Sequence, residues 1–361
     1  MKSRSNLRRG IAAALLSLLV FCVLGEILAR SFDLVDRLNA FPRGLYVATD
    51  DEKLPYLLRP EMDAEARGVH VVTNEHGMRG PQVAEKPAPG THRVLVLGDS
   101  VAFGFRLEEG DTFPRLLETE LRERTGQPVE VLNAGVEGYN SENELALLER
   151  TGLPLEPETV VVAFNLNDYD YGPVMGPMGV MTLDRSQRVS SWSLANLSEF
   201  YLLLRWLGAL GWQRFFGPEP PPPPPADPSS PFDAFDRYVS ALRKQYYAKP
   251  NDERWATMVE SLRGMSALAR EKGFRLLVAI LPDGDQIGVA DPDLTPQRKL
   301  AEICAAERLE CLDLRPVFVD AAGAEPLFLD IMHPNAKGHR LIADALAEKL
   351  AAAARSGTAT R

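Results

Sequence analysis

The chain has 361 residues, of which 45% are hydrophobic and 25% charged, and its formal net charge is -10. This length and composition predict one large α/β domain with additional segments, and they exclude a disordered chain. The sequence contains no internal repeat, so a solenoid is excluded as well. The acidic balance also excludes a nucleic-acid partner, because binding to phosphates requires a basic surface and the basic residues cluster only near the N-terminus.

The first 30 residues predict a membrane segment. Lys2, Arg4, Arg8 and Arg9 precede an uncharged apolar run over Ile11–Gly25, which is intermediate in length between a signal-peptide core and a full span of about 20 residues. No convincing small-x-small cleavage site follows, so we expect an uncleaved signal anchor with its basic end in the cytoplasm and the rest of the chain exported. A buried helix of a cytosolic protein is disfavoured because the run has no polar face.

Residues 31–90 are predicted to form a juxtamembrane connector. Within it, Gly68–Arg79 alternates as a strand does and ends in turn residues, and Ala84–Gly90 is a linker. Its scattered histidines are interpreted as surface or turn residues: His70, His76 and His92.

The segment Arg93–Gly104, RVLVLGDSVAFG, is the centre of the predicted fold. Its uninterrupted apolar residues Val94–Leu97 indicate a parallel strand buried on both faces, and Gly98 permits a tight exit. Ser100 therefore follows the carboxyl end of a strand, where open α/β sheets bind their ligands. The alternative is that Ser100 only caps the next helix.

Helices and strands alternate after Ser100. We expect a helix over Phe113–Thr125 closed by Gly126, a strand over Pro128–Ala134 and a third buried strand over Thr159–Phe164. Between the last two, Ser141–Arg150 is predicted to be a helix, with Ser141 and Glu144 at capping-box spacing.

The alternation stops over residues 171–251, which we interpret as an insertion. Leu194–Phe216 is strongly apolar and aromatic, and a helix packed against protein is favoured over one that covers the active site or lies on a bilayer surface. Pro220–Pro225 predicts an extended polyproline spacer.

The alternation resumes with a helix over Trp255–Lys272 and a buried strand over Phe274–Leu281. A helix over Pro296–Arg308 and a short strand over Cys311–Leu314 follow. The main domain, over residues 91–355, ends with the helix Asn335–Arg355. Residues 356–361 form a polar tail.

The cysteines leave two alternatives open. Cys304 and Cys311 lie on a predicted helix and at the head of a predicted strand, so they form either a disulfide or two independent buried thiols. Cys22 lies within the membrane segment, in a poor context for lipid attachment. No CxxC and no clustered histidines accompany them, so we expect no metal site and no cofactor.

Polar residues and one glycine follow the ends of the predicted parallel strands and should converge at one edge of the sheet. They are Ser100, Gly138, Asn167, Asp330 and His333. Acyl transfer needs a nucleophile, a base, a group that orients the base, and donors to the oxyanion, and this set supplies each of them.

Each of these residues also has a purely structural interpretation. Gly138 can serve a turn, Asn167, Asp168 and Asp330 can cap helices, and His333 can be a loop histidine. His339 competes as the base, but we expect it inside the final helix, whereas Asp330 and His333 are close enough in sequence to share one loop. Asp99 is expected to stabilise its turn, and Asp283 has no assigned role.

Four blocks resemble the SGNH subgroup of the GDSL hydrolases. They are GDS at Gly98–Ser100, NAGVEG at Asn133–Gly138, NLND at Asn165–Asp168 and DIMH at Asp330–His333. The resemblance covers Arg93–Asp168 and Trp255–Arg355, in the block order of the family.

The resemblance implies a flavodoxin-like, three-layer α/β/α fold around five parallel strands. It implies that Ser100 is the nucleophile, His333 its base and Asp330 the residue that holds the imidazole. The oxyanion donors would be the backbone N–H groups of Ser100 and Gly138 and the side chain of Asn167. The third block usually begins with glycine, so Asn165 is a departure that predicts a less permissive backbone there.

Together these features predict an exported serine esterase that acts on a small-molecule or glycan ester, with an O-acetyl or other short acyl group. One alternative is an O-acetyltransferase of exported polysaccharide that uses the same residues. The other is a catalytically inactive scaffold of the cell envelope. Protein partners are not predicted.

Overall fold

The computed structural model describes residues 2–38, 44–168, 174–175, 181–182, 198–216, 247, 253–323 and 325–358. The chain divides into two compact units, one made of residues 1–48 and 173–221 and the other of residues 49–172 and 222–361. Most of the predicted insertion over 171–251, including the polyproline run, and the end of the predicted tail lie outside the described residues. The predicted domain boundaries stay predictions.

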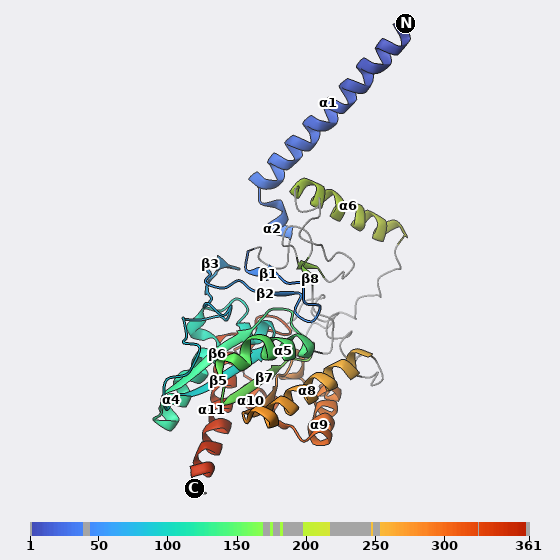
Figure 1. Ribbon diagram of the computed structural model, residues 1–361. Coiled ribbons are helices and arrows are strands. Elements are labelled where there is room, and N and C mark those ends of the chain that lie inside the picture. Colours follow the sequence, from blue (N-terminus) through green and yellow to red (C-terminus); the bar gives the residue numbers. More distant parts are fainter. Residues whose placement is uncertain are drawn as a thin grey trace. The chain divides into compact units, whose positions relative to one another are not determined.

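The first unit contains the long N-terminal helix α1 (Lys2–Ser31) (Figure 1). Arg8–Ser31 contains an 18-residue window with a mean hydropathy of 2.6, of which only 6% is buried, so this stretch is long and apolar enough to cross a membrane. Both a signal anchor and a signal peptide have these properties. The same unit contains β1 (Tyr46–Ala48), α2 (Leu34–Leu38), the short hairpin of β8 (Val174–Met175) and β9 (Met181–Thr182), and α6 (Glu199–Phe216).

The second unit is built on a five-stranded parallel sheet. Its strands are β5 (His92–Gly98), β6 (Val129–Gly135), β7 (Thr159–Phe164), β10 (Arg275–Ile280) and β11 (Glu310–Asp313). Their spatial order is β11-β10-β7-β5-β6, so the first strand of the sheet lies between the second and the third. This is the flavodoxin-like order, and the predicted fold class is confirmed.

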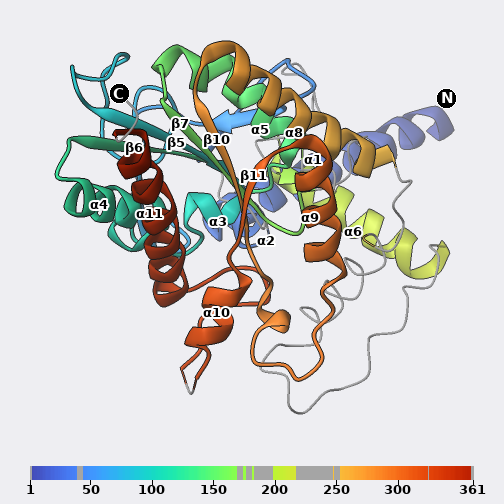
Figure 2. The same ribbon diagram turned by 90° about the horizontal axis from the view of Figure 1, so that it is seen from below.

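The strands are apolar because both faces of the sheet are covered by helices (Figure 2). Every residue of β7 is buried, as are all residues of β5 after His92. On one face, Val94, Val96 and Val161 pack in a single cluster with α4 (Phe113–Thr125) and α11 (Ala336–Thr358).

The opposite face carries α5 (Ser141–Leu147) and α8 (Glu253–Lys272), which pack closely against each other. A methyl group added at Gly264 of α8 would come within 2.8 Å of the Leu145 side chain of α5. The sheet is therefore the middle of three layers. α9 (Thr295–Glu307) precedes β11, and α10 (Arg315–Ala321) follows it.

Residues ahead of the sheet also belong to the second unit. They include β2 (Tyr56–Leu58) and an antiparallel hairpin of β3 (Asp63–Ala66) and β4 (Val69–Val72), whose turn holds Arg67 and Gly68. The strand predicted over 68–79 is therefore shorter than expected. Beyond it the Asn74 side chain accepts hydrogen bonds from the backbone of His76 and Met78, as a turn residue does.

The capping box predicted at Ser141 and Glu144 is wrong by one position. Asn140 is the N-cap of α5, its side chain accepts from the backbone of Asn143, and the Asn143 side chain accepts in return from the Asn140 backbone. Glu144 instead points into the interior and is fully buried. The helix also ends at Leu147 and continues as a wider turn over Leu148–Gly152.

Cys304 and Cys311 form a disulfide, which decides between the two alternatives left by the sequence. The bridge joins the last turn of α9 to the beginning of β11, the edge strand. It therefore fixes the start of the strand that leads into the loop of Asp330 and His333.

Replacing both cysteines, by Cys304→Ser with Cys311→Ser, is expected to lower the free energy of unfolding by about 2 kcal/mol. The bridge spans only seven residues, so it restricts the unfolded chain modestly. Urea denaturation of the detergent-solubilised protein measures the change, with Cys22→Ser as the control that should not alter it. An unchanged unfolding midpoint in the double variant would contradict this role.

Candidate active site

Ser100 lies immediately beyond the carboxyl end of β5, at the first residue of the short helix α3 (Ser100–Phe103). The turn is tight: a methyl group added at Gly98 would lie 2.7 Å from Cβ of Ala102 and 3.1 Å from Cβ of Ala163. Asp99 is the N-cap, and its side chain accepts from the backbone of Val101 at 2.8 Å. The turn thus holds the backbone of Ser100 rigidly.

The structure brings Ser100, His333 and Asp330 together in one hydrogen-bonded chain. Ser100 Oγ lies 2.8 Å from His333 Nε2, and His333 Nδ1 lies 2.8 Å and 2.7 Å from the two carboxylate oxygens of Asp330. Because a carboxylate accepts and does not donate, the contact with Asp330 assigns the proton to Nδ1 and leaves Nε2 as the acceptor for the Ser100 hydroxyl.

Asp330 also shapes the loop that carries His333. Its Oδ1 accepts from the backbone N–H groups of Met332 and His333, each at 2.9 Å. Partial burial acts to raise the pKa of Asp330, but the hydrogen bonds and charge of His333, with the two backbone donors, outweigh it and lower the pKa. The carboxylate therefore stays ionised beside the imidazole.

Gly138 and Asn167 follow β6 and β7 at the same edge of the sheet. Gly138 has a φ of 79°, which favours glycine, so its amide is presented by a backbone that other residues rarely adopt. Within the described residues, neither the Gly138 N–H nor the side chain of Asn167 takes part in a hydrogen bond. Both remain able to bind an incoming oxygen atom.

Asn165 explains how this chain accommodates its departure from the usual third block. Its Nδ2 donates to Asp99 Oδ2 at 3.1 Å, and its Oδ1 accepts from the backbone of Leu166 at 2.7 Å. Asn165 has no positive φ, so glycine is not required there. The side chain ties the end of β7 to the turn that carries Ser100.

His339 does not contact Ser100 but is built into the core. It is 1% exposed, lies within α11, and its Nδ1 accepts from the backbone N–H of Phe113 at 2.9 Å. Burial, with smaller effects of His333 and Arg79, lowers the pKa of His339 to about 3. His339 is therefore neutral, and it accepts a hydrogen bond from a backbone N–H in the first turn of α4 that has no acceptor within the helix. Asp283 begins the turn after β10, where its backbone N–H donates to Gln286 Oε1 at 3.2 Å.

The model of the GDSL-like Lipase/Acylhydrolase family matches residues 96–341, which is more than half of the chain. The chain belongs to this family. The match includes all five residues at the sheet edge and leaves α1 and the hairpin β3–β4 outside.

Individual relatives are more distant. The chain is 32% identical to the arylesterase of Vibrio mimicus over 100 residues, which make up 28% of this chain and 48% of that protein. The chain therefore spans about half the length of this curated relative.

Two solved structures cover most of the chain at low identity. An acetylxylan esterase from Geobacillus stearothermophilus is 14% identical with a TM-score of 0.41, covering 71% of this chain and 92% of that one. An α/β-hydrolase enzyme from the metagenome of Lake Arreo, Spain, is 14% identical with a TM-score of 0.41, covering 72% of this chain and 94% of that one.

Side chains other than these five also reach the site, and no pattern in the sequence indicated them. The Phe105 ring stacks on the His333 imidazole, with centroids 4.1 Å apart and planes at 23°. Arg67, from the turn of the hairpin, lies 4.8 Å from the centroid of the same Phe105 ring and pairs with Glu137, the neighbour of Gly138. Arg106 lies 5.1 Å from that centroid.

Tyr56 and Tyr139 support the loop of Gly138. The Tyr56 hydroxyl donates to the Glu137 carbonyl at 2.8 Å, the Tyr139 hydroxyl donates to the Tyr56 carbonyl, and the two rings meet edge to face. Burial raises the pKa of both tyrosines, so both stay protonated donors. Residues of β2, which the sequence assigned to a connector, therefore hold the position of Gly138.

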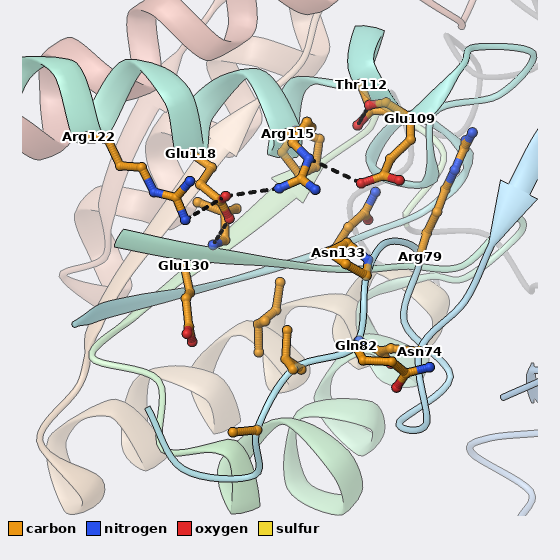
Figure 3. A pocket seen from close by; sticks show the side chains of 16 residues that line it. Asn74, Arg79, Gln82, Glu109, Thr112, Arg115, Glu118, Arg122, Glu130 and Asn133 are labelled. Atoms are coloured by element: carbon orange, nitrogen blue, oxygen red, sulfur yellow. Dashed lines mark hydrogen bonds and ion pairs between the residues drawn. The ribbon is translucent and has the colours of Figure 1, made fainter. Parts of the chain in front are cut away.

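A cavity of about 350 Å³ lies beside the edge strand β6, and none of the five sheet-edge residues lines it (Figure 3). Two of its charged side chains, Glu118 and Arg122, bond to the open edge of β6. Glu118 accepts from the Val131 backbone and pairs with Arg115 and Arg122, and Arg122 donates to the Val129 carbonyl. These contacts protect an exposed edge from pairing with another strand.

No group of three or more His, Cys, Asp or Glu side chains is arranged to hold a metal ion in the part of the chain that the structure describes.

Glu144 is a buried acid beneath the site, where an ionised carboxylate would be energetically unfavourable. It is fully buried, neither carboxylate oxygen has a hydrogen-bond partner, and burial, together with the charge of Asp99, raises its pKa well above the usual value. The folded protein therefore keeps a proton on Glu144 where the unfolded chain has lost it, and the free energy of unfolding falls as the pH rises above about 4.3.

Glu144→Gln is expected to remove this dependence. Between about pH 5 and pH 8 its stability should fall less steeply than that of the wild type, with a difference of up to about 1.4 kcal/mol per pH unit. Urea denaturation at several pH values measures the slope, and Glu149→Gln, an exposed position that follows α5, is the matched control. Parallel curves for Glu144→Gln and the wild type would show that Glu144 is ionised in the folded protein.

Phe105→Leu is expected to lower kcat on an ester substrate about two- to tenfold while leaving the fold intact. An aromatic stack contributes about 0.5–1.5 kcal/mol beyond area burial, and here it holds the ring of His333. Steady-state kinetics with an aryl ester measure the effect. Phe328→Leu, which replaces a ring packed on Phe318 and not on His333, is the control. Equal losses in both variants would assign Phe105 a merely structural role.

Proposed function

We propose that this protein is a membrane-anchored, exported serine esterase that hydrolyses a small-molecule or glycan ester with a short acyl group, such as O-acetyl. The observation that carries the proposal is the chain Ser100–His333–Asp330, with its two hydrogen-bonded links of 2.8 Å and 2.7–2.8 Å at the carboxyl edge of the sheet. Family membership supports the class of reaction.

In the proposed reaction, Ser100 Oγ attacks the ester carbonyl while His333 Nε2 takes the hydroxyl proton. Asp330 holds the imidazole by its Nδ1–H and stabilises the positive charge that forms. His333 then gives the proton to the leaving alcohol, and the acyl group remains on Ser100. A water molecule, deprotonated by His333, attacks the acyl-enzyme and releases the acid.

The negative charge on the carbonyl oxygen needs donors that are fixed before the reaction begins. The backbone N–H groups of Ser100 and Gly138 and the Asn167 amide are assigned this role. Ser100 is the first residue of α3, where the backbone N–H has no intrahelical acceptor. The positive φ of Gly138 and the place of Asn167 directly after β7, at the same edge of the sheet, support the same assignment.

The proposed location depends on α1 and on the disulfide. Basic residues before the apolar span favour a cytoplasmic N-terminus, which exports the second unit. The Cys304–Cys311 bridge fits an oxidising compartment outside the cytoplasm.

A fluorophosphonate probe tests the nucleophile directly. The wild type should be labelled and should hydrolyse aryl esters, with acetyl preferred over longer acyl chains, whereas Ser100→Ala should lose both labelling and turnover. Thr119→Ala, a hydroxyl on the exposed side of α4, is the matched control. Labelling that persists in Ser100→Ala would exclude Ser100 as the nucleophile. A wild type that is neither labelled nor active would favour an inactive scaffold, and products that form only with an added glycan would favour acyl transfer.

Asn167→Ala is expected to lower kcat about 100-fold with little change in the unfolding midpoint, because one oxyanion donor is worth about 3 kcal/mol in the transition state. Steady-state kinetics and thermal denaturation measure the two effects. Near-normal turnover would remove Asn167 from the oxyanion hole.

A further inference from the structure

Within the first unit, α6 begins on the side of α1. The Glu26 carboxylate of α1 accepts from Ser198 Oγ at 2.7 Å, from the Glu199 backbone at 3.2 Å and from the Phe200 backbone at 3.0 Å. The first N–H groups of a helix have no intrahelical partner and attract negative charge. The start of α6 therefore supplies hydrogen-bond donors to Glu26, an acidic residue near the end of the apolar stretch of α1.

The two helices also touch closely at this point. The rings of Phe21 and Phe200 meet edge to face with centroids 5.2 Å apart. A methyl group added at Gly25 would come within 2.7 Å of the Phe200 ring, so a larger residue there would displace the ring. The start of α6 is therefore held at one level along α1.

The spacing between charged residues of α1 is close to the thickness of the hydrocarbon core of a bilayer. Glu26 follows the basic residue Arg9 by 17 positions, which is about 26 Å along a helix at about 1.5 Å per residue. The hydrocarbon core of a bilayer is about 30 Å thick. With Arg9 at one headgroup layer, Glu26 and the first turn of α6 reach the opposite layer.

α6 has two different faces in its first two turns. Leu202 is buried against Val35 of α2, and Leu203 and Trp206 pack around the same contact. The other face is apolar but exposed: Tyr201 is 47%, Leu204 is 44% and Leu207 is 65% exposed. The latter residues are spaced by three, so they form one stripe along the helix.

The direction of α6 fits a position on the membrane surface. Figures 1 and 2 show that α6 leaves the end of α1 and runs away from it instead of alongside it. Its 18 residues carry charge only at Glu199, Arg205 and Arg214.

We propose that α6 is an interfacial helix whose exposed stripe, Tyr201, Leu204 and Leu207, lies in the surface of the bilayer that α1 crosses. The proposal rests on α1 as a membrane anchor, which is part of the proposed function. The contact with α1 is the reason to expect lipid, and not another protein, against the stripe. Because the first turn of α6 is hydrogen-bonded to Glu26 near the end of the apolar span, α6 begins at the lipid boundary. The sequence favoured a helix packed only against protein, and the exposed stripe argues against that interpretation.

Single cysteines in the full-length protein test the proposal. In a Cys22→Ser background, Leu207→Cys is labelled with an environment-sensitive fluorophore and reconstituted into phosphatidylcholine liposomes. Leu18→Cys, 58% exposed on α1, reports the anchor, and Val289→Cys, 49% exposed in the second unit, is the aqueous control. Nitroxide-bearing lipids quench labels in the bilayer, and iodide quenches labels in water.

The label at Leu207 should be quenched by the nitroxide lipids at least about twofold more than the label at Val289, and correspondingly less by iodide. Quenching of Leu207 by iodide, with Leu18 in lipid, would overturn the interfacial helix and leave the anchor intact. Shielding of Leu207 from both quenchers would indicate a protein cover, such as a second copy of the chain, and would also overturn it. A Leu18 label in water would overturn the anchor, and the interfacial helix with it. None of these outcomes depends on esterase activity.

Discussion

Parallel pairing of β5 with β6 on one side and β7 on the other is the constraint on which the site depends. In register, Gly98 lies opposite Gly135 of β6 and Ala163 of β7, so three strands end at one level. The loops that follow these strands therefore all lie at the carboxyl edge of the sheet. The close approach at Gly98 then turns the chain at once into α3, which fixes Ser100 above the sheet.

Buried polar groups around this edge are mostly satisfied, which gives the region a single arrangement. Asp99 is fully buried yet bonds to Val101 and Asn165. At the opposite end of β5, Arg93 is also fully buried and donates to Glu130 and to three backbone carbonyls. Glu144 has no hydrogen-bond partner for its carboxyl group and avoids the cost of a buried charge by keeping a proton. The floor of the site therefore combines rigid hydrogen bonding with one neutralised acid.

Segments before the family match complete the surroundings of the site. Tyr56 holds the carbonyl beside Gly138, and Arg67 links Glu137 to the Phe105 ring that covers His333. A truncation that kept only the matched residues would leave these side chains out. The part of the chain that the sequence assigned to a connector is, from residue 49 on, a support for the site.

The sheet and the residues at its edge could be predicted from the amino-acid sequence. Uninterrupted apolar strands separated by amphipathic helices are local patterns, and parallel topology forces their carboxyl ends together, so Ser100, Asp330 and His333 were expected to meet from spacing and block order alone. The same argument separated His333 from His339, because the latter falls inside a helix. The departure at Asn165 was visible, but its bond to Asp99 was not.

Four features became apparent only in the folded protein: the cysteine pairing, the burial of Glu144, the stacking of Phe105 and the contact of Glu26 with α6. Each of these features depends on how turns and helix ends pack against one another. Periodic patterns in the sequence carry no information about that packing. Glu144 shows the reason most clearly. Its spacing from Ser141 is that of a capping box, but Glu144 lies on the face of α5 that packs against the sheet, so its side chain is buried.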